Sequence, residues 1–568
     1  MSASAVPAIT AGLKPELFSD LGAGSVSRGL LALVLTVLVL AGFGFRVTSL
    51  SSEGLSEDEL NKLTAVSDYR AHGLTSANGE HPFLMKALLT VSVVGAEKWN
   101  QTSFVSRNPE LLVPVETALR LPNALFGALT SILIYLVASE LFGFEVALLA
   151  AALWAFDPLA IGLNRIAKED TLLTFFFLLA NVFWLRGQRV AETQTQRNPE
   201  PFYWATAVAF GAMMASKYLP QAIAIPIAYN YVFQAIPATR WRIGRPRFLK
   251  FFVIMGIAFL ILNPTILLPE TWRMMTSFAN FKVIGHDSYE FMGKLYLHRG
   301  TDWFRGQPWY FYFVLIGVKW PVLTLLGFVA GAPLLFRRKI GDGRYFILFW
   351  MFIWALTFVA SGGKFTRYLT FVLPAAIITA AIGTQFVARH LASLGARAFG
   401  DNVRVYARAA LSSFVIIAAV WSAAKAAPHY RLYVNALGGG PARAGSYFPQ
   451  DEFYDAYMRD AMGEIARGAR IGARIASELP TVAYYYAQQA NRSDLSCVEL
   501  SAPGAVEELT AGDFVIDARG RTYFSNQAML LRLRRSGQPA LRVAVGAIPA
   551  ADIYVLDQTS LAALQGRQ

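Results

Sequence analysis

Long apolar stretches constrain the fold of this chain more than any other feature of its sequence. Gly29–Phe45 reads GLLALVLTVLVLAGFGF, and Phe252–Leu268 reads FVIMGIAFLILNPTILL. About 20 apolar residues in a helix are enough to cross a bilayer. Of the 568 residues, 55% are hydrophobic and only 16% are charged, a balance that a soluble protein does not need. The sequence therefore predicts an α-helical polytopic membrane protein.

Hydropathy predicts eleven membrane spans. The first is expected to be a retained anchor, because no small-residue cleavage site follows it. The apolar run 83–96 is short and carries Lys86 near its start, so we expect it to be re-entrant or interfacial. The predicted spans are 29–46, 119–139, 145–163, 171–187, 202–216, 219–235, 251–268, 308–335, 345–361, 367–389 and 408–427.

The distribution of charge fixes the predicted orientation. With a cytoplasmic N-terminus, the segments 240–250, 337–344 and 389–408 lie inside, and they are rich in arginine. Segment 47–118 lies outside and holds more acidic than basic residues. This agrees with the positive-inside rule, so the net charge of +13 indicates basic cytoplasmic loops rather than a nucleic-acid partner. The single cysteine, Cys497, excludes an internal disulfide.

This topology divides the chain into three parts. Residues 1–28 form a cytoplasmic tail, 29–427 a transmembrane domain with long outside loops at 47–118 and 269–307, and 428–568 an outside soluble domain. The last part is expected to be mixed α/β. Its strand-like runs are TVAYYYA (481–487), DFVIDA (513–518), LRVAVGAI (541–548) and DIYVLD (552–557), and a helical pattern covers 452–476.

Ionisable residues gather at the outer ends of several predicted spans, on the same side as the acidic cluster Glu57-Asp58-Glu59. They are Arg120, Arg165, Lys168, Glu169, Asp170, Lys217, Lys364 and Arg367. Clustered Lys and Arg in a partly dehydrated site suit a phosphate or pyrophosphate, and a nearby carboxylate suits a general base. The pattern predicts one outer cavity that binds an anion, such as a lipid phosphate.

Some of these residues have a structural alternative. Ser56-x-x-Glu59 fits a helix capping box, so Glu59 is either a cap partner or a site residue. His81 precedes Pro82 and either ends a turn or faces the site. His286 is a weak candidate for a metal ligand and a better one for donor or acceptor binding.

The motifs resemble those of the protein O-mannosyltransferases and their bacterial relatives, which are polyprenyl-phosphate-dependent glycosyltransferases of the GT-C class. The resemblance covers about residues 29–430 and extends to YFPQDEFYD (447–455). HPFLMK (81–86) departs from the family's His-Pro-Pro-Leu-Gly-Lys-like element at Phe83 and Met85. The matching elements are Asp58-Glu59, His81 with Lys86, Arg165 with Asp170, Ser216-Lys217, GHDSYEFMGKLYLHRG (285–300), QPWYFYFVLIGVKWP (307–321) and KFTRYLTFVLP (364–374).

The resemblance implies a GT-C fold, which makes 29–427 the catalytic domain, and an inverting mechanism. Asp58, with Glu59 beside it, would deprotonate the acceptor hydroxyl. The donor would be a polyprenyl-phosphate sugar, most often mannose in this family, and no metal cofactor is expected to be obligatory. The donor phosphate would be held by Lys217 and Arg367, with Arg165 and Lys364, and the other expected site residues are Asp170, His81, Lys86, Arg120 and His286.

Several alternatives stay open from sequence. The acceptor is either Ser/Thr of exported protein or an envelope glycan, as in the related aminoarabinose transferases acting on lipid A. A transporter or flippase of lipid-linked substrates is the alternative from another class, although no repeat symmetry supports it. The expected location is a bacterial inner membrane, with the site facing the periplasm. The sequence leaves the oligomeric state open.

Overall fold

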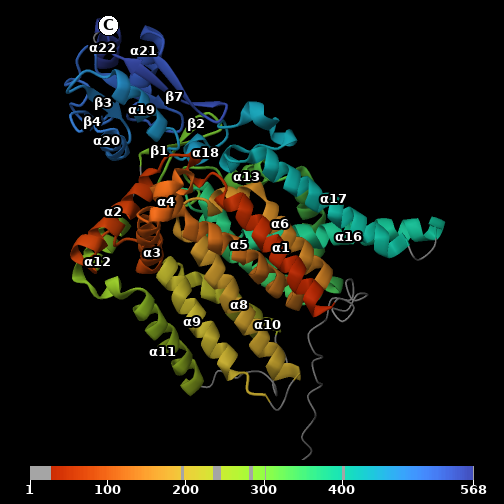
Figure 1. Ribbon diagram of the computed structural model, residues 1–568. Helices are drawn as coiled ribbons and strands as arrows, with labels where there is room; N and C mark the ends of the chain where they lie inside the picture. The colour runs from red at the N-terminus through yellow and green to blue at the C-terminus, as the bar shows by residue number, and fades with distance from the viewer. Residues whose placement is uncertain are drawn as a thin grey trace, which may run out of the picture.

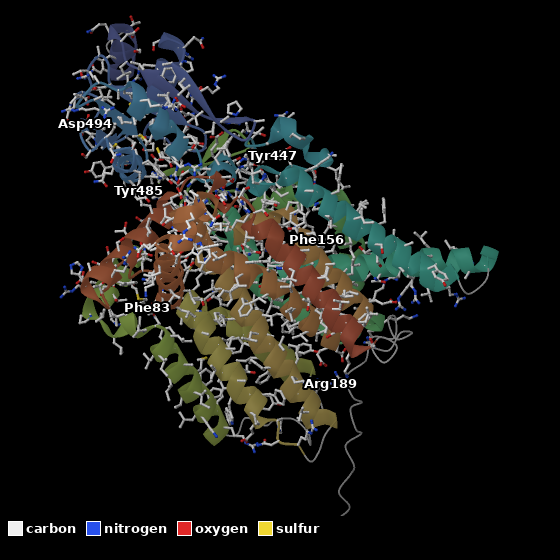
Figure 2. The ribbon with its side chains drawn as sticks, viewed as in Figure 1. Phe83, Phe156, Arg189, Tyr447, Tyr485 and Asp494 are labelled. Carbon is white, nitrogen blue, oxygen red and sulfur yellow. The ribbon has the colours of Figure 1, made fainter. Side chains whose placement is uncertain are left out.

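The computed structural model describes residues 27–193, 197–233, 245–280, 286–300, 302–399 and 403–566. A bundle of apolar helices makes up the first three quarters of the chain, and a domain with a β-sheet is set on one end of it (Figure 1). Arg189, labelled in Figure 2, lies at the opposite end of the bundle, near the end of α8. The bundle therefore has two distinct ends, one of them covered by the sheet domain.

Every predicted span coincides with a helical segment. Within the described residues, five helices are long and apolar enough to cross a membrane, and a bent pair raises this number to six. The protein is thus a helical membrane protein, and the count of eleven remains a prediction. The helices in these segments are α1 Arg28–Val47, α5 Val115–Phe142, α6 Phe144–Phe156, α7 Pro158–Asn164, α8 Glu169–Thr193, α9 Glu200–Ser216, α10 Ala224–Phe233, α11 Arg245–Leu262, α13 Phe311–Lys319, α14 Val322–Gly331, α15 Gly343–Phe358, α16 Leu373–Phe399 and α17 Val403–Ala426.

Two of the predicted spans are broken, each at a proline. Helices α6 and α7 meet at Asp157-Pro158 with a bend of 59°. Helix α13 ends at Lys319, and α14 begins at Val322 after Pro321. A proline has no N–H for the helical hydrogen bond and clashes with the preceding turn, which explains why each helix stops there.

Close contact between α14 and α16 depends on glycines. A Cβ atom on Gly331 would lie 2.0 Å from the carbonyl oxygen of Thr379, and one on Gly383 would lie 2.0 Å from that of Gly327. Small residues let membrane helices approach backbone to backbone. Van der Waals packing then stabilises the pair, because the hydrophobic effect does not drive helices together within lipid.

The first segment predicted to lie outside, 47–118, is largely helical and packs against the bundle. Helices α2 (Glu57–His72) and α3 (Phe83–Asn100) contact each other, and α3 also packs on α5. Two buried residues, Met85 and Leu89, anchor α3. Short helices α4 (Ser103–Arg107) and η4 (Pro109–Leu111) lead into α5.

The second loop predicted to lie outside contains a β-hairpin that the sequence did not predict. Helix α12 (Pro269–Asn280) is followed by strands β1 (Ser288–Phe291) and β2 (Lys294–Leu297), which pair antiparallel. The turn uses Met292 and Gly293, both with positive φ. The hairpin lies between the helical bundle and the sheet domain (Figure 1).

The sheet domain is mixed α/β, as predicted. Its strands run in the order β4-β3-β5-β7-β6, with β3 parallel to β4 and β5, and β7 antiparallel to β5 and β6. The bounds are β3 Arg474–Ser477, β4 Ser496–Glu499, β5 Phe514–Ala518, β6 Leu541–Val545 and β7 Ile548–Val555, with helices α18 Pro449–Phe453, α19 Met458–Gly468, α20 Pro480–Gln489, α21 Gln527–Ser536 and α22 Gln558–Gln565.

The sheet domain shares its hydrophobic core with the outer helices. One buried cluster joins Met462 of α19 and Ile475 of β3 to Leu60 of α2 and Met85 of α3. A separate cluster on the sheet's other face joins Val515 of β5 to α21 and α22. Because the first cluster is continuous across the junction, the sheet domain is fixed against the outer helices rather than hanging from a linker.

Two local predictions for this domain were wrong. TVAYYYA (481–487) forms helix α20 instead of a strand, because Pro480 starts a helix and the buried residues Val482, Ala483, Tyr486 and Ala487 recur with helical spacing. The helix predicted over 452–476 is interrupted, and its last residues form β3. Tyr is common in strands, but helical packing overrides that preference.

Candidate active site

A cavity of 480 Å³ lies where the outer ends of the bundle helices meet the sheet domain. Its walls come from α2, the turn before α8, the residues after α9, the segment 365–368 and the tail segment 450–455. Its lining is mostly polar and charged: Ser56, Glu57, Asp58, Glu80, His81, Pro82, Lys168, Glu169, Asp170, Lys217, Tyr218, Met275, His286, Phe365, Arg367, Tyr368, Gln450, Asp451, Tyr454, Asp455 and Arg521. Of the outer charges that the sequence predicts to converge, Lys168, Glu169, Asp170, Lys217 and Arg367 line this cavity together with Asp58.

Asp58 reaches the cavity from the first turn of α2. Its side chain is 33% exposed, and Lys168 Nζ lies 2.9 Å from its Oδ1. The Tyr454 hydroxyl donates to its Oδ2 at 2.9 Å, and the Arg367 guanidinium lies 3.7 Å from the same oxygen. Burial alone raises the pKa of Asp58, but the charges of Lys168 and Arg367 outweigh burial and hold that pKa well below its usual value. Asp58 is therefore ionised.

The turn between α7 and α8 supplies a second pair of carboxylates. Glu169 is buried and pairs with Lys62 of α2 at 2.7 Å. Asp170 pairs with Lys217 at 2.6 Å, while its Oδ2 is buried and makes no hydrogen bond within the described residues. Acids in the first turn of a helix suit its macrodipole, which helps to explain their position at the start of α8.

Lys217 follows the end of α9 and points toward the ring of Tyr368, with its Nζ 4.9 Å from the ring centroid. Burial lowers the pKa of this ammonium, but Asp170 outweighs burial and raises the pKa above its usual value. Lys217 therefore carries a full positive charge in the cavity.

Arg367 differs from the other cations of the cavity. Its side chain is 12% exposed and lies on the ring of Phe365, 3.8 Å from the centroid. The nearest carboxylate oxygens, on Asp58 and Asp451, are 3.7 Å and 3.8 Å from its nitrogens, too far for hydrogen bonds. Within the described residues this guanidinium makes no hydrogen bond. The N–H groups of Arg367 therefore have no protein acceptor among the described residues, although the residue lines a charged cavity. A planar guanidinium with available donors suits a phosphate.

The C-terminal part of the chain after α17, called the tail from here on, supplies one wall of the cavity. Tyr454 and Asp455 both have left-handed backbone conformations, with φ of 47° and 62°. Asp455 accepts three hydrogen bonds from Arg521 and one from the backbone N–H of Glu57. Non-glycine residues rarely adopt this conformation, which is concentrated at functional sites. The tail is therefore fixed directly onto the helical turn that carries Asp58.

Sequence reasoning did not assign a role to Tyr454, Asp455, Asp451 or Arg521, and it named Lys168 only as part of the outer charges. Asp451 accepts from the Tyr289 hydroxyl and from the backbone N–H of Thr366, each at 2.7 Å. The only signal for the tail was the family-like run YFPQDEFYD, which contains three of these residues. No pattern pointed to Arg521.

The two histidines of the cavity are neutral. Burial lowers the pKa of His81 to about 3, and its Nδ1 lies 3.8 Å from Glu169. Burial, followed by the charge of Arg521, lowers the pKa of His286 to about 3, and its ring stacks on Tyr523 at 4.0 Å. Each histidine can thus act only as a neutral hydrogen-bonding group at physiological pH.

Glu59 and Arg120, although predicted as site residues, lie behind the cavity. The capping box exists, with the Ser56 N–H donating to Glu59 at 3.1 Å. Both Glu59 oxygens also accept from Arg120, at 2.8 Å and 2.7 Å, and the residue is 0% exposed. The remaining Arg120 donors reach the carbonyls of Leu50, Glu53 and Gly54. These contacts hold the segment 50–59 in place.

Three further predicted residues bind backbone carbonyls outside the cavity lining. Arg165 donates to the carbonyls of residues 45, 46, 48 and 49. Lys364 donates to those of Gln307 and Ser361. Lys86 donates to those of residues 77, 78 and 81. Each stabilises a chain segment next to the cavity, so none is placed to contact a ligand within it.

The described residues contain no group of three or more His, Cys, Asp or Glu side chains with the arrangement needed to hold a metal ion. Asp58, Glu169 and Asp170 are each paired with a lysine instead. The cavity combines ionised carboxylates with cations, an arrangement that suits proton abstraction next to a bound anion.

The comparisons with known proteins agree with this chemistry. Residues 110–268, from the start of α5 to the end of the α11 segment, match the family described as dolichyl-phosphate-mannose-protein mannosyltransferase. This region carries Lys168, Asp170 and Lys217. No curated protein sequence matches the chain.

The fold is shared with a solved structure. ArnT from Cupriavidus metallidurans in the apo state has a TM-score of 0.50 and 15% identity, with 92% of this chain and 98% of that chain covered. The same protein bound to undecaprenyl phosphate gives a TM-score of 0.47, 15% identity and coverage of 93% and 98%. The apo oligosaccharyltransferase from Archaeoglobus fulgidus gives 0.48, 12%, and coverage of 87% and 70%.

The chain has the GT-C fold of ArnT, and part of it, residues 110–268, is similar to the family described as dolichyl-phosphate-mannose-protein mannosyltransferase. The family match favours the transferase interpretation over the transporter.

Proposed function

We propose that this protein transfers a sugar, with mannose as the first candidate, from a polyprenyl phosphate to an acceptor hydroxyl. The observation that carries the proposal is the arrangement of Asp58 and Arg367. An ionised carboxylate lies 3.7 Å from a guanidinium that makes no hydrogen bond within the described residues, and both line one cavity. The description of the matching family, which names dolichyl-phosphate-mannose, supports both the donor class and the sugar.

In the proposed reaction, Arg367 and Lys217 bind the donor phosphate. Asp58 accepts the proton of the acceptor hydroxyl as its oxygen attacks the anomeric carbon. The new C–O bond forms while the bond from the anomeric carbon to the phosphate oxygen breaks, and the phosphate leaves with that electron pair. One displacement inverts the anomeric configuration. The two cations stabilise the charge that develops on the leaving phosphate.

Lys168 and Tyr454 have a positioning role in this proposal. Both contact Asp58 at 2.9 Å, on different carboxylate oxygens. They keep the carboxylate ionised, and they also make it a weaker base, because they stabilise its charged form. A donor phosphate that draws Lys168 or Arg367 away from Asp58 would restore part of its basicity. Proton abstraction would then be favoured only after the donor is bound.

We also propose that the eleven predicted segments cross the membrane, with residues 29–427 as the catalytic domain and 428–568 as a domain outside. The cavity and the sheet domain then face the periplasm of a bacterial inner membrane. Supporting this orientation, the basic segments 337–344 and 389–408 belong to the inside loops expected from charge.

The first candidate acceptor is the hydroxyl of Ser or Thr in an exported protein, because the family's description names a protein acceptor. An envelope glycan, lipid A included, is the alternative. A second polar cavity, between the β1–β2 hairpin and the sheet domain, favours this alternative.

The experiment uses the full-length protein in nanodiscs with radiolabelled polyprenyl-phosphate mannose and a membrane extract as the source of acceptors. Wild type is expected to transfer label, and Asp58→Asn to lose about 10²–10⁴-fold in rate, the usual contribution of a general base. Equal transfer by both proteins would rule out Asp58 as the base. Absence of transfer and of donor hydrolysis by wild type would rule out this donor.

A further inference from the structure

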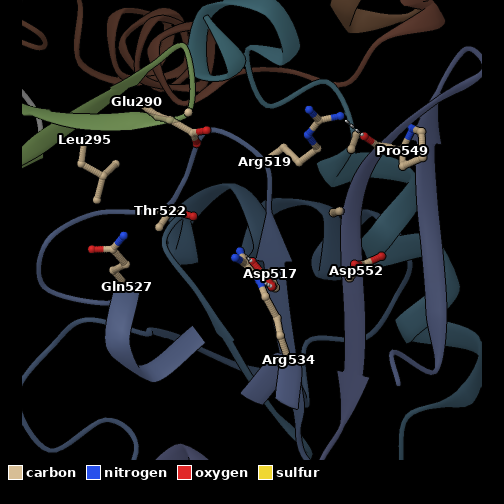
Figure 3. Close-up of a pocket in the computed structure, with 12 residues that line it drawn as sticks. Glu290, Leu295, Asp517, Arg519, Thr522, Gln527, Arg534, Pro549 and Asp552 are labelled. Carbon is tan, nitrogen blue, oxygen red and sulfur yellow. Dashed lines mark hydrogen bonds and ion pairs between the residues drawn. The ribbon is translucent and has the colours of Figure 1, made fainter. Parts of the chain in front are cut away.

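A second cavity lies outside the candidate active site, between the β1–β2 hairpin and the sheet domain. It has a volume of 340 Å³. Figure 3 shows that Glu290 enters it from the hairpin, whereas Asp517, Arg519 and Arg534 enter it from the sheet domain. Thr522 and Gln527 complete its polar side. We call this space the outer pocket.

The outer pocket and the catalytic cavity are neighbours that share the same two chain segments. In the loop after β5, Arg519 and Thr522 line the outer pocket, whereas Arg521 lines the catalytic cavity. The Cα atoms of Arg519 and Arg521 are at most about 7 Å apart, because two residues span no more. On the other side, His286 lines the catalytic cavity and Glu290 the outer pocket. A molecule longer than one sugar unit can thus be in contact with both spaces.

The wall between the two spaces is built by close backbone contact. Gly520 has a φ of 81°, and a Cβ atom there would lie 2.3 Å from the backbone nitrogen of Gln450. Only glycine fits this position. The loop of the sheet domain therefore lies directly on the tail segment that carries Tyr454 and Asp455.

The charges around the outer pocket are balanced. Asp517 is paired with Arg534 through two hydrogen bonds, and Asp552 is paired with Arg542. Among the described residues, Arg519 donates only to the carbonyls of residues 445 and 549. Glu290 makes no hydrogen bond or ion pair within the described residues, and burial raises its pKa, with Arg519 and Arg534 opposing this. A balanced lining disfavours a strongly charged ligand and suits one that both donates and accepts hydrogen bonds.

The sheet beneath the pocket gives no edge for a peptide. The pocket lies over β5 and β7, two interior strands of the sheet. Strand β5 pairs with β7 over Phe514–Ala518 and with β3 over Phe514 and Val515, and β7 also pairs with β6. A peptide therefore cannot add as a further strand between β5 and β7. Recognition must come from side chains, as it does for a polyhydroxylated ligand.

We propose that the outer pocket binds a neutral saccharide unit of the acceptor. This selects the glycan alternative over the Ser/Thr hydroxyl that the family's description favours, with the next sugar of the glycan lying beyond the catalytic cavity. The assignment rests on the proposed transferase function for its role in catalysis. Glu290 and Thr522 would hydrogen-bond sugar hydroxyls, and the Asp517–Arg534 pair would orient the ring. The tail and the hairpin would then set acceptor choice, while the membrane helices carry the chemistry.

The test compares three acceptors with the full-length protein in nanodiscs and labelled polyprenyl-phosphate mannose. They are methyl mannoside, a neutral mannotriose, and a Ser/Thr peptide. Wild type is expected to favour the trisaccharide over methyl mannoside by about tenfold in kcat/KM, equivalent to 1.4 kcal/mol. Equal use of the two sugars, or a preference for the peptide, would overturn the proposal.

The variant Thr522→Trp is designed to fill the outer pocket, because residue 522 lines this pocket and not the catalytic cavity. It is expected to remove the preference for the trisaccharide and to leave both the KM for methyl mannoside and donor hydrolysis without acceptor unchanged. Ala528→Trp is the matched control, because residue 528 lies six residues further along the chain, is exposed on α21 and does not line the pocket. The proposal fails if Thr522→Trp keeps the preference or if Ala528→Trp loses it.

A binding measurement separates this proposal from the proposed function. Saturation-transfer NMR with mannotriose and no donor should give a signal with wild type and with Ala528→Trp, and a signal at least several-fold weaker with Thr522→Trp and Glu290→Gln. Binding without any sugar transfer would refute the donor assignment and retain the saccharide site. Transfer without any effect of the two variants on binding would refute the site and retain the transferase.

Discussion

Asp58 and Glu59 are adjacent residues in the first turn of α2, yet they belong to two different layers of charge. We call the residues Asp58, Lys168, Asp170, Lys217 and Arg367 the front layer, because all five line the catalytic cavity. We call Glu59, Arg120 and Arg165 the rear layer, because they lie behind it. In the rear layer almost every donor and acceptor has a backbone or side-chain partner.

The difference between the layers is in hydrogen bonding more than in charge. Arg120 and Arg165 are both surrounded by carbonyl oxygens, and Arg120 also holds Glu59. Arg367 makes no hydrogen bond within the part of the chain that the structure describes, although two carboxylates are within 4 Å. Charged groups whose donors and acceptors already have partners hold the backbone in place, whereas an arginine with available donors can bind a ligand. Four substitutions test this distinction.

The largest effect is expected from Glu59→Gln. Its carboxylate forms a buried ion pair with Arg120, and breaking such a pair by removing one partner costs about 3–5 kcal/mol of stability. Thermal unfolding of the protein in nanodiscs should detect this loss. Asp58→Asn is the matched control one residue away, and it should change stability much less. Equal destabilisation by the two variants would remove the distinction between the layers.

Arg367→Lys should weaken donor binding. A lysine keeps the charge but loses the planar fork, and a hydrogen bond to a charged group contributes about 1.5–3 kcal/mol, which corresponds to a KM for the donor raised by roughly 10–100-fold. Steady-state kinetics with varied donor measures this. Arg165→Lys should lower stability and leave the donor KM unchanged. A raised donor KM in Arg165→Lys alone would reverse the proposed roles.

Lys168→Met should change the pH dependence of activity. Lys168 lowers the pKa of Asp58, so its removal should raise that pKa. Asp58 acts as a base only when it is ionised, and the acid limb of kcat/KM should therefore move to higher pH. An unchanged acid limb would mean that another group controls it. The substitution Lys62→Met removes the partner of the buried Glu169. It should move the acid limb of kcat/KM less than Lys168→Met does.

Tyr454→Phe is expected to have the smallest effect, roughly a tenfold loss in kcat/KM, equivalent to about 1.4 kcal/mol. The variant removes the hydroxyl that donates to Asp58. Tyr457→Phe is a close control, because the Tyr457 hydroxyl is buried in the same segment and makes no hydrogen bond within the described residues. The acid limb of kcat/KM should also move to higher pH in Tyr454→Phe and stay in place in Tyr457→Phe. Identical behaviour of the two variants would show that Tyr454 has a packing role.

Much of the fold followed from the sequence because it depends on local composition. Apolar stretches located the helical segments, and proline explains the breaks at residues 158 and 321. The mixed character of the sheet domain was also predictable from its alternating runs. The YYY run was not, because only its tertiary neighbours decide whether three tyrosines are buried with a helical or a strand period.

The site was predictable to the extent that it lies at helix ends. The order of spans placed Asp58, Asp170, Lys217 and Arg367 on one side, and the structure brings these four into one cavity. Residues of the rear layer have the same residue types and the same position at helix ends, so sequence could not separate them. Tyr454 and Arg521 were missed because their contacts join segments that are far apart in the chain.

The attachment of the tail to α2 has a consequence for the assembly of the enzyme. Ribosomes complete the last membrane helix, α17, before they reach Asp455, and Arg521 follows later still. Domains generally fold as they emerge during synthesis, with N-terminal parts first. The helices can therefore be in place while one wall of the cavity is still absent. On the proposed topology, an incomplete chain carries every membrane helix but no closed site, so sugar transfer begins only once the C-terminal part has crossed the membrane and bound to α2.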